Sequence, residues 1–184
     1  MKKVYNLPNL LTCIRLILII PILILLYIDN RILNLISAVL FVIASLTDII
    51  DGYLARRLNQ VTKIGKLIDP LADKLLILSV LIVLLKLNRV PLIFALIIIA
   101  REFIITGLRA VASSEGIIIP ASQIGKDKTF FQTVSFTCLI IYHPLFGINS
   151  YSVGLFFLVV AVLYTIISGY KYIKDFISIL NNEN

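Results

Sequence analysis

Residues 32–53 read ILNLISAVLFVIASLTDIIDGY, an apolar stretch of membrane-spanning length that ends in two aspartates. About 20 predominantly apolar residues are enough for a helix to cross the hydrocarbon core of a bilayer. Similar stretches recur along the whole chain of 184 residues, of which 60% are hydrophobic and only 15% are charged. Soluble domains contain about 45–50% apolar residues, so this composition predicts a membrane protein without a separate soluble domain.

The hydropathy pattern predicts an all-α fold with six transmembrane helices in a single membrane domain, residues 1–184. Before the first span, Met1–Asn9 combines two lysines with apolar residues. This pattern favours a short N-terminal segment lying in the membrane interface. The predicted spans are Leu10–Ile28, Ile32–Tyr53, Ile68–Leu87, Pro91–Ala112, Thr129–Leu145 and Ser152–Tyr172.

The lysines and arginines predict the orientation of these spans. Most of them fall on the side of the two termini, whereas only Arg31, Lys86 and Arg89 fall on the other side. The positive-inside rule therefore predicts a multi-pass protein of the cytoplasmic membrane with both termini in the cytoplasm. Orientation and anionic lipid headgroups account for the net charge of +7. No nucleic-acid partner is expected, because a soluble basic face with aromatic residues is missing.

Four of the ten acidic residues cluster where the second predicted span ends and the third begins: Asp48, Asp51, Asp69 and Asp73. An ionised carboxylate near the bilayer centre costs roughly 2.5–3.5 kcal/mol on insertion scales. Spacings of three and four residues place both members of each pair on one helix face, and a short link makes the two helices antiparallel neighbours. Clustered oxygen ligands of this kind suit hard cations such as Mg²⁺ or Mn²⁺.

Two other interpretations of these carboxylates remain open. They could form structural ion pairs with nearby cations, namely Arg56, Arg57, Lys66 and Lys74. They could also mark a cation or proton pathway, because carboxylates inside membranes occur in transporters. Against a transporter, the acids lie near one membrane face and no inverted repeat with broken helices is visible.

The chain resembles a known family in the stretch DIIDGYLAR, residues 48–56, followed by Gly65, Asp69 and Asp73. These residues match all eight fixed positions in the signature of the CDP-alcohol phosphatidyltransferase family. Such enzymes transfer a phosphatidyl group from CDP-diacylglycerol to an alcohol and release CMP. The resemblance implies two divalent ions, Mg²⁺ or Mn²⁺, that clamp the attacking and leaving oxygens.

The resemblance also implies roles for individual residues. Asp48, Asp51 and Asp69 are expected to bind the metal ions, and Asp73 matches the general base and is also expected to contact a metal. The expected contacts to CDP-diacylglycerol are Gly52, Ala55, Arg56 and Thr62. Small residues such as the first two also serve tight helix packing in membranes, and the threonine could be an ordinary loop residue.

Flanking residues resemble a bacterial branch of the family that uses sn-glycerol 3-phosphate as the acceptor. They include the opening segment NLPNLLT with Arg15, and the run from Arg101-Glu102 to Arg109. Cations expected to bind the acceptor's phosphate are Arg109, Lys126, Lys128 and Arg101. Either lysine could instead serve only orientation, and Arg101 could pair with Glu102 or a neighbouring helix.

The sequence therefore predicts a cytoplasm-facing phosphatidyltransferase, and relatives in the family imply a homodimer. Within the family, serine, inositol phosphate or phosphatidylglycerol are alternative acceptors. Outside it, the alternative is a cation-coupled transporter.

Overall fold

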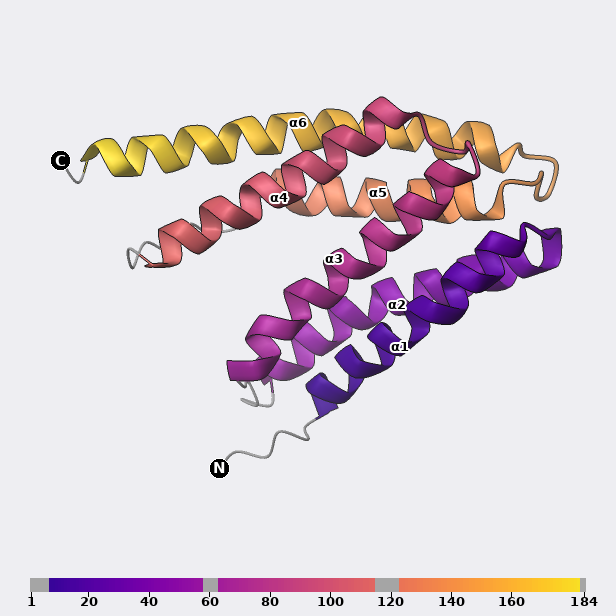
Figure 1. Cartoon of the computed structure of the whole chain (residues 1–184), viewed down its shortest axis with the longest axis horizontal. Coiled ribbons are helices and arrows are strands. Elements are labelled where there is room, and N and C mark those ends of the chain that lie inside the picture. Colours follow the sequence, from indigo (N-terminus) through magenta and orange to yellow (C-terminus); the bar gives the residue numbers. More distant parts are fainter. Residues whose placement is uncertain (1–6, 58–62, 115–122, 183–184) are drawn as a thin grey trace.

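A computed structural model describes residues 7–57, 63–114 and 123–182, with side chains for residues 10, 12–47, 71–114 and 123–179. The described chain forms six helices (Figure 1). They are α1 (Leu7–Ile28), α2 (Arg31–Arg57), α3 (Lys63–Lys86), α4 (Leu92–Ser114), α5 (Gln123–Ile141) and α6 (Ser150–Asn182). The prediction of an all-α protein with six helices is confirmed.

The helix ends differ from the prediction where local chemistry overrides hydropathy. The fifth helix ends at Ile141 instead of Leu145, because Tyr142 has a φ of 61° and Pro144 follows shortly after it. The sixth helix continues ten residues past Tyr172, through turns in which charged and apolar residues are mixed. At the N-terminus, residues 7–9 of the predicted interfacial segment are the first turn of α1, and residues 1–6 lie outside the described residues.

The helices form two groups of three that lie side by side (Figure 1). In the first group α1 packs against α2 and α3, and in the second α6 packs against α4 and α5. The groups meet mainly where α2 contacts α5 and α3 contacts α4 and α5. The connections 29–30, 87–91 and 142–149 lie at one end, here called the turn end, and α2 ends and α3 begins at the opposite end (Figure 1).

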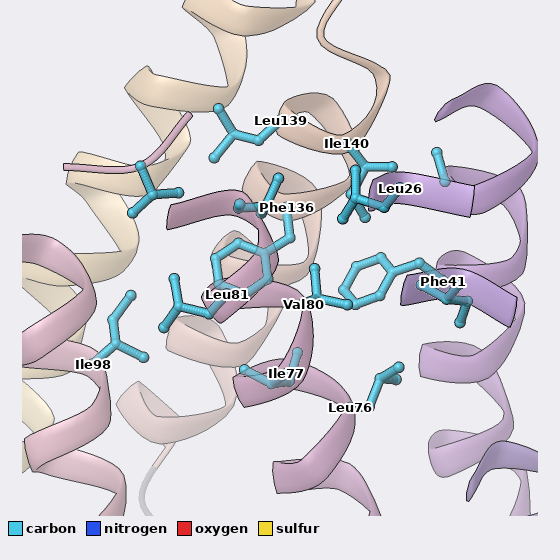
Figure 2. Close-up of a cluster of buried hydrophobic side chains, with 14 of the residues drawn as sticks. Leu26, Phe41, Leu76, Ile77, Val80, Leu81, Ile98, Phe136, Leu139 and Ile140 are labelled. Carbon is cyan, nitrogen blue, oxygen red and sulfur yellow. The ribbon is translucent and has the colours of Figure 1, made fainter. Parts of the chain in front are cut away.

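Apolar side chains fill the space between the two groups (Figure 2). Phe41 of α2, Val80 and Leu81 of α3 and Phe136 of α5 are fully buried. Large apolar residues also cover the outside of the helices: Ile17, Ile20, Val39, Ile82, Phe103, Phe156, Leu163 and Ile167 are all exposed. A fold that is apolar both inside and outside fits a lipid environment.

Within the described residues, Ser150–Ile179 of α6 is the one helix long and apolar enough to cross a membrane. Thr12–Ile28 and Arg31–Thr47 are shorter apolar helices. The six helices are therefore established, whereas six membrane spans stay a prediction.

A buried arginine ties the turn end together. Arg89 is 1% exposed, and its guanidinium donates to the carbonyl oxygens of Leu139 and Ile140 at 3.0 and 2.9 Å and also to the Asp29 carboxylate. Burial lowers the pKa of Arg89, and the charge of Asp29 opposes this effect. The same guanidinium lies 4.2 Å from the ring centroid of Tyr142. One side chain from the α3–α4 connection thus joins the α1–α2 turn to the last carbonyls of α5.

Candidate functional site

The predicted metal-binding residues lie on the last turns of α2 and the first turns of α3. Asp48 and Asp51 belong to α2, and Asp69 and Asp73 to α3. Each pair therefore lies on one helix, as predicted from its spacing of three or four residues. The two helices contact each other. The side chains of the first three aspartates lie outside the described residues, and Asp73 is half-buried. Among the described residues no group of three or more potential metal ligands is found.

The predicted contacts to CDP-diacylglycerol fall in the same region. Gly52, Ala55 and Arg56 are within α2, but their side chains lie outside the described residues, as does Thr62 entirely. The acidic residues that the sequence supplies at the end of α2 and the start of α3 offer carboxylate oxygens as donors. This chemistry fits Mg²⁺ or Mn²⁺, which prefer hard oxygen ligands.

Lys74, next to Asp73, connects α3 to α4. Its Nζ atom donates a hydrogen bond to Oγ1 of Thr106, and that hydroxyl donates to the carbonyl oxygen of Glu102 at 2.5 Å. Lys74 also interacts electrostatically with Asp73, Glu102, Arg101 and Arg109. The aspartate end of α3 therefore faces charged residues of α4.

A network of buried charges joins α4 to α5 and α6. The Oε1 atom of Glu102 accepts hydrogen bonds from NH1 of Arg101 at 3.0 Å and from Nζ of Lys128. The side chains of Lys128 and Glu102 are only 6% and 13% exposed. Arg101 also donates to Oγ of Ser168 on α6 at 3.3 Å. Buried charges need such pairing, because an isolated ion would lose its hydration without compensation.

Arg109 lies two turns further along α4 and makes a different contact. Its guanidinium carbon is 5.5 Å from the ring centroid of Tyr172 on α6, a distance within the range of cation–π attraction. Arg109 is exposed, whereas Tyr172 is 7% exposed. Within the described part of the chain, the hydroxyl of Tyr172 has no hydrogen-bond partner.

The cations predicted to bind the acceptor's phosphate differ in burial and in position. Lys128 is buried and within electrostatic reach of Asp73. Lys126 is exposed, and two residues along a helix correspond to a rotation of about 200°, so it lies on the opposite face of α5. The pairing of Arg101 with Glu102, considered above as an alternative role, is present. The structure thus places Lys128 within electrostatic range of Asp73, and Arg101 and Arg109 within electrostatic range of the neighbouring Lys74, whereas Lys126 lies outside this group.

The sequence suggested Glu102 as a structural partner of Arg101, but the contact of Glu102 with Lys128 was not predicted. A signal for this contact existed, because an acid within an apolar span needs a partner just as the four aspartates do. The sequence gave no comparable signal for Thr106, Ser168 or Tyr172, because single hydroxyl residues in apolar helices are common.

Comparison with known proteins identifies the family of this chain. The sequence profile of the CDP-alcohol phosphatidyltransferase family matches residues 5–167. The chain belongs to this family.

Three relatives are similar over most of their length. A CDP-diacylglycerol--glycerol-3-phosphate 3-phosphatidyltransferase of Rickettsia felis is 46% identical, with 92% of this chain and 94% of the relative covered. The protein of the same description from Bacillus subtilis is 38% identical, with 98% and 100% covered. A probable phosphatidylglycerophosphate synthase of Mycobacterium tuberculosis is 34% identical, with 93% and 81% covered.

Proposed function

We propose that this protein transfers the phosphatidyl group of CDP-diacylglycerol to sn-glycerol 3-phosphate, giving phosphatidylglycerol phosphate and CMP in phospholipid biosynthesis. The descriptions of the Rickettsia and Bacillus relatives support this substrate pair. The observation that carries the proposal is a set of cations around the aspartate end of α3: Lys128 is within electrostatic range of Asp73, and Arg109 is within electrostatic range of the adjacent Lys74. A phosphorylated acceptor needs cations beside the reacting group, whereas an uncharged alcohol does not.

The reaction is a displacement at phosphorus. The hydroxyl oxygen of the acceptor forms a bond to the lipid-bearing phosphorus of CDP-diacylglycerol, and the bond from that phosphorus to the CMP oxygen breaks. Asp73 is the proposed base that takes the hydroxyl proton, and the bonding electrons leave with CMP. The site at Asp73 lies beside positive charge, which also suits a phosphate leaving group.

Asp48, Asp51 and Asp69, together with Asp73, are the proposed ligands of divalent cations, Mg²⁺ or Mn²⁺. When bound, two such ions supply charge compensation for the attacking and leaving oxygens. The aspartates of each pair share a helix face because they are three or four residues apart. This placement lets one short stretch of α2 and one of α3 serve a common site.

The nucleotide end of CDP-diacylglycerol is proposed to bind along the last turns of α2. Because Gly52 and Ala55 are small, the nucleotide end of the substrate can approach the helix closely. The guanidinium of Arg56 is suited to the pyrophosphate, because its planar fork donates paired hydrogen bonds. Thr62 is the proposed hydroxyl contact to the nucleotide.

The acceptor's phosphate is proposed to bind Arg109 and Lys128. The guanidinium of Arg101 is already hydrogen-bonded to Glu102 and Ser168, and eight residues of helix separate Arg101 from Arg109 by about 12 Å. Arg101 is therefore assigned to the support of the phosphate site, and Lys126, on the other face of α5, to membrane orientation.

The protein is proposed to be a single membrane domain with six spans, and a homodimer as its family suggests. Helix α6 has 33 residues, a length of about 50 Å that exceeds the roughly 30 Å of a hydrocarbon core. Its last turns, which carry Lys174 and Asp175, are therefore proposed to extend beyond the hydrocarbon core. The tally of basic residues supports a cytoplasmic location for this side, where glycerol 3-phosphate would reach the site.

The proposal is tested with purified protein, CDP-diacylglycerol, Mg²⁺ and a panel of alcohols, with CMP release as the measurement. We expect release with glycerol 3-phosphate and a loss of release when the metal is chelated. Preferred use of serine, inositol phosphate or phosphatidylglycerol would refute the acceptor assignment. Ion flux without CMP release would instead identify a cation-coupled transporter.

A further inference from the structure

Glu102 is an acidic residue within α4 that holds a cation on either side. One carboxylate oxygen, Oε1, accepts from the neighbouring Arg101 and from Lys128 on α5. Both partners are largely buried, with side chains 16% and 6% exposed. A buried pair that loses one partner leaves an uncompensated charge, so the carboxylate determines where the two cations lie.

The position of Lys128 matters because this residue interacts electrostatically with the proposed base, Asp73, which lies on a third helix. A lysine ammonium is a point charge on a flexible stem with three donors. Glu102 accepts from one of these donors and fixes the stem, so the same ammonium can also donate to a phosphate oxygen.

We infer that Glu102 is a positioning residue for the acceptor's phosphate, and this inference rests on the function proposed above. The carboxylate does not bind the substrate itself, because it would repel a phosphate dianion. It acts through Lys128, whose ammonium it holds beside Asp73. Arg101, anchored by the same carboxylate and by Ser168, ties this support to α6.

The substitution Glu102→Gln distinguishes the positioning of Lys128 from the long-range effect of one negative charge on the acceptor's phosphate. Glutamine has nearly the same shape but lacks the negative charge, so the site becomes more positive by one unit. Long-range attraction alone would then lower the KM for glycerol 3-phosphate. Loss of the anchor raises that KM instead. The direction of the change in KM therefore distinguishes the two effects.

The experiment measures CMP release by the full-length protein at varied glycerol 3-phosphate and at varied CDP-diacylglycerol. We expect E102Q to raise the KM for glycerol 3-phosphate about tenfold or more, as for the loss of one charge-assisted contact. The KM for CDP-diacylglycerol should stay within about twofold. The matched control is Asp175→Asn, which removes one negative charge from an exposed side chain of α6 and should leave both KM values unchanged.

A double-mutant cycle shows whether Glu102 acts through Lys128. In the Lys128→Met background, adding Glu102→Gln should change the acceptor KM by no more than about twofold, because the group being positioned is gone. An equal rise in both backgrounds would overturn the inference. An unchanged or lowered acceptor KM in E102Q, or a parallel rise in both KM values, would overturn it as well.

Two further measurements distinguish a failure of the proposed function from a failure of the role assigned to Glu102. Wild-type protein is tested first: lack of turnover with glycerol 3-phosphate refutes the proposed function, whereas normal turnover with an unaltered E102Q refutes only the role of Glu102. If E102Q does not fold, Glu102→Asp takes its place, since it keeps the charge on a shorter side chain. A raised acceptor KM in E102D supports the inference, and an unchanged one overturns it.

Discussion

Replacing Gly154 with alanine tests the packing of α5 on α6, on which the position of Lys128 depends. A Cβ atom at Gly154 would lie 2.8 Å from Cγ of Leu139 and 3.1 Å from its backbone nitrogen. The same glycine accepts a hydrogen bond from Ser135 at 2.8 Å through its carbonyl oxygen. The missing side chain of Gly154 and this hydrogen bond allow α5 and α6 to pack closely. The backbone of Leu139 cannot move away from an added Cβ atom without shifting α5.

The expected size of the effect follows from two opposing terms. Overpacking costs about 1–3 kcal/mol, and alanine in a helix is favoured over glycine by about 1 kcal/mol. We expect a net loss of up to about 2 kcal/mol in the free energy of unfolding. For a chain of this size that corresponds to a Tm lower by up to roughly 8 °C.

The matched control is Gly107→Ala in α4, where a new Cβ atom would meet nothing within 4 Å. This variant should keep or raise the Tm, because only the gain in helix propensity applies. Thermal unfolding of the two purified variants in the same detergent provides the comparison. A Tm of Gly154→Ala at or above that of the wild type, or an equal loss in Gly107→Ala, would refute the reasoning.

Four further outcomes are expected. Asp51→Asn should abolish CMP release, because an amide is a poorer ligand for a divalent cation; full activity at preserved expression would contradict the metal assignment. Asp73→Asn should lose turnover but retain much of its CDP-diacylglycerol binding, and binding lost in parallel would make Asp73 mainly a ligand. Arg109→Lys should raise the KM for glycerol 3-phosphate with little change in that for CDP-diacylglycerol, since lysine cannot copy the paired hydrogen bonds of a guanidinium; unchanged acceptor kinetics would remove Arg109 from the site. In intact cells, a single cysteine at Asn88 should react with an impermeant reagent and one at Lys63 should not, and the reverse result would overturn the predicted orientation.

Much of the fold followed from hydropathy, because an apolar run of spanning length leaves few alternatives to a helix. The helix ends were harder to predict. Tyr142 ends α5 through its left-handed backbone, a conformation that hydropathy does not report. The predicted sixth span ends at Tyr172 because Lys174 and Asp175 follow it, yet the helix continues for ten residues past that point.

The candidate site, too, could be predicted only in part. The spacing of the aspartates was informative because it depends only on the geometry of one helix at a time. The sequence could not distinguish Lys126 from Lys128, since the partner that buries Lys128 is Glu102 on another helix. Tyr172, which lies under Arg109, could not be predicted for the same reason. Contacts between helices depend on packing, and a local pattern does not contain that information.

The arginine clamp at the turn end restricts how the molecule can open. Arg89 joins the α1–α2 turn, through Asp29, to the final carbonyls of α5, through Leu139 and Ile140. The two helix groups are therefore fastened to each other at that end. Any separation of the two helix groups is therefore smallest at the turn end and greatest at the opposite end, where α2 ends and α3 begins.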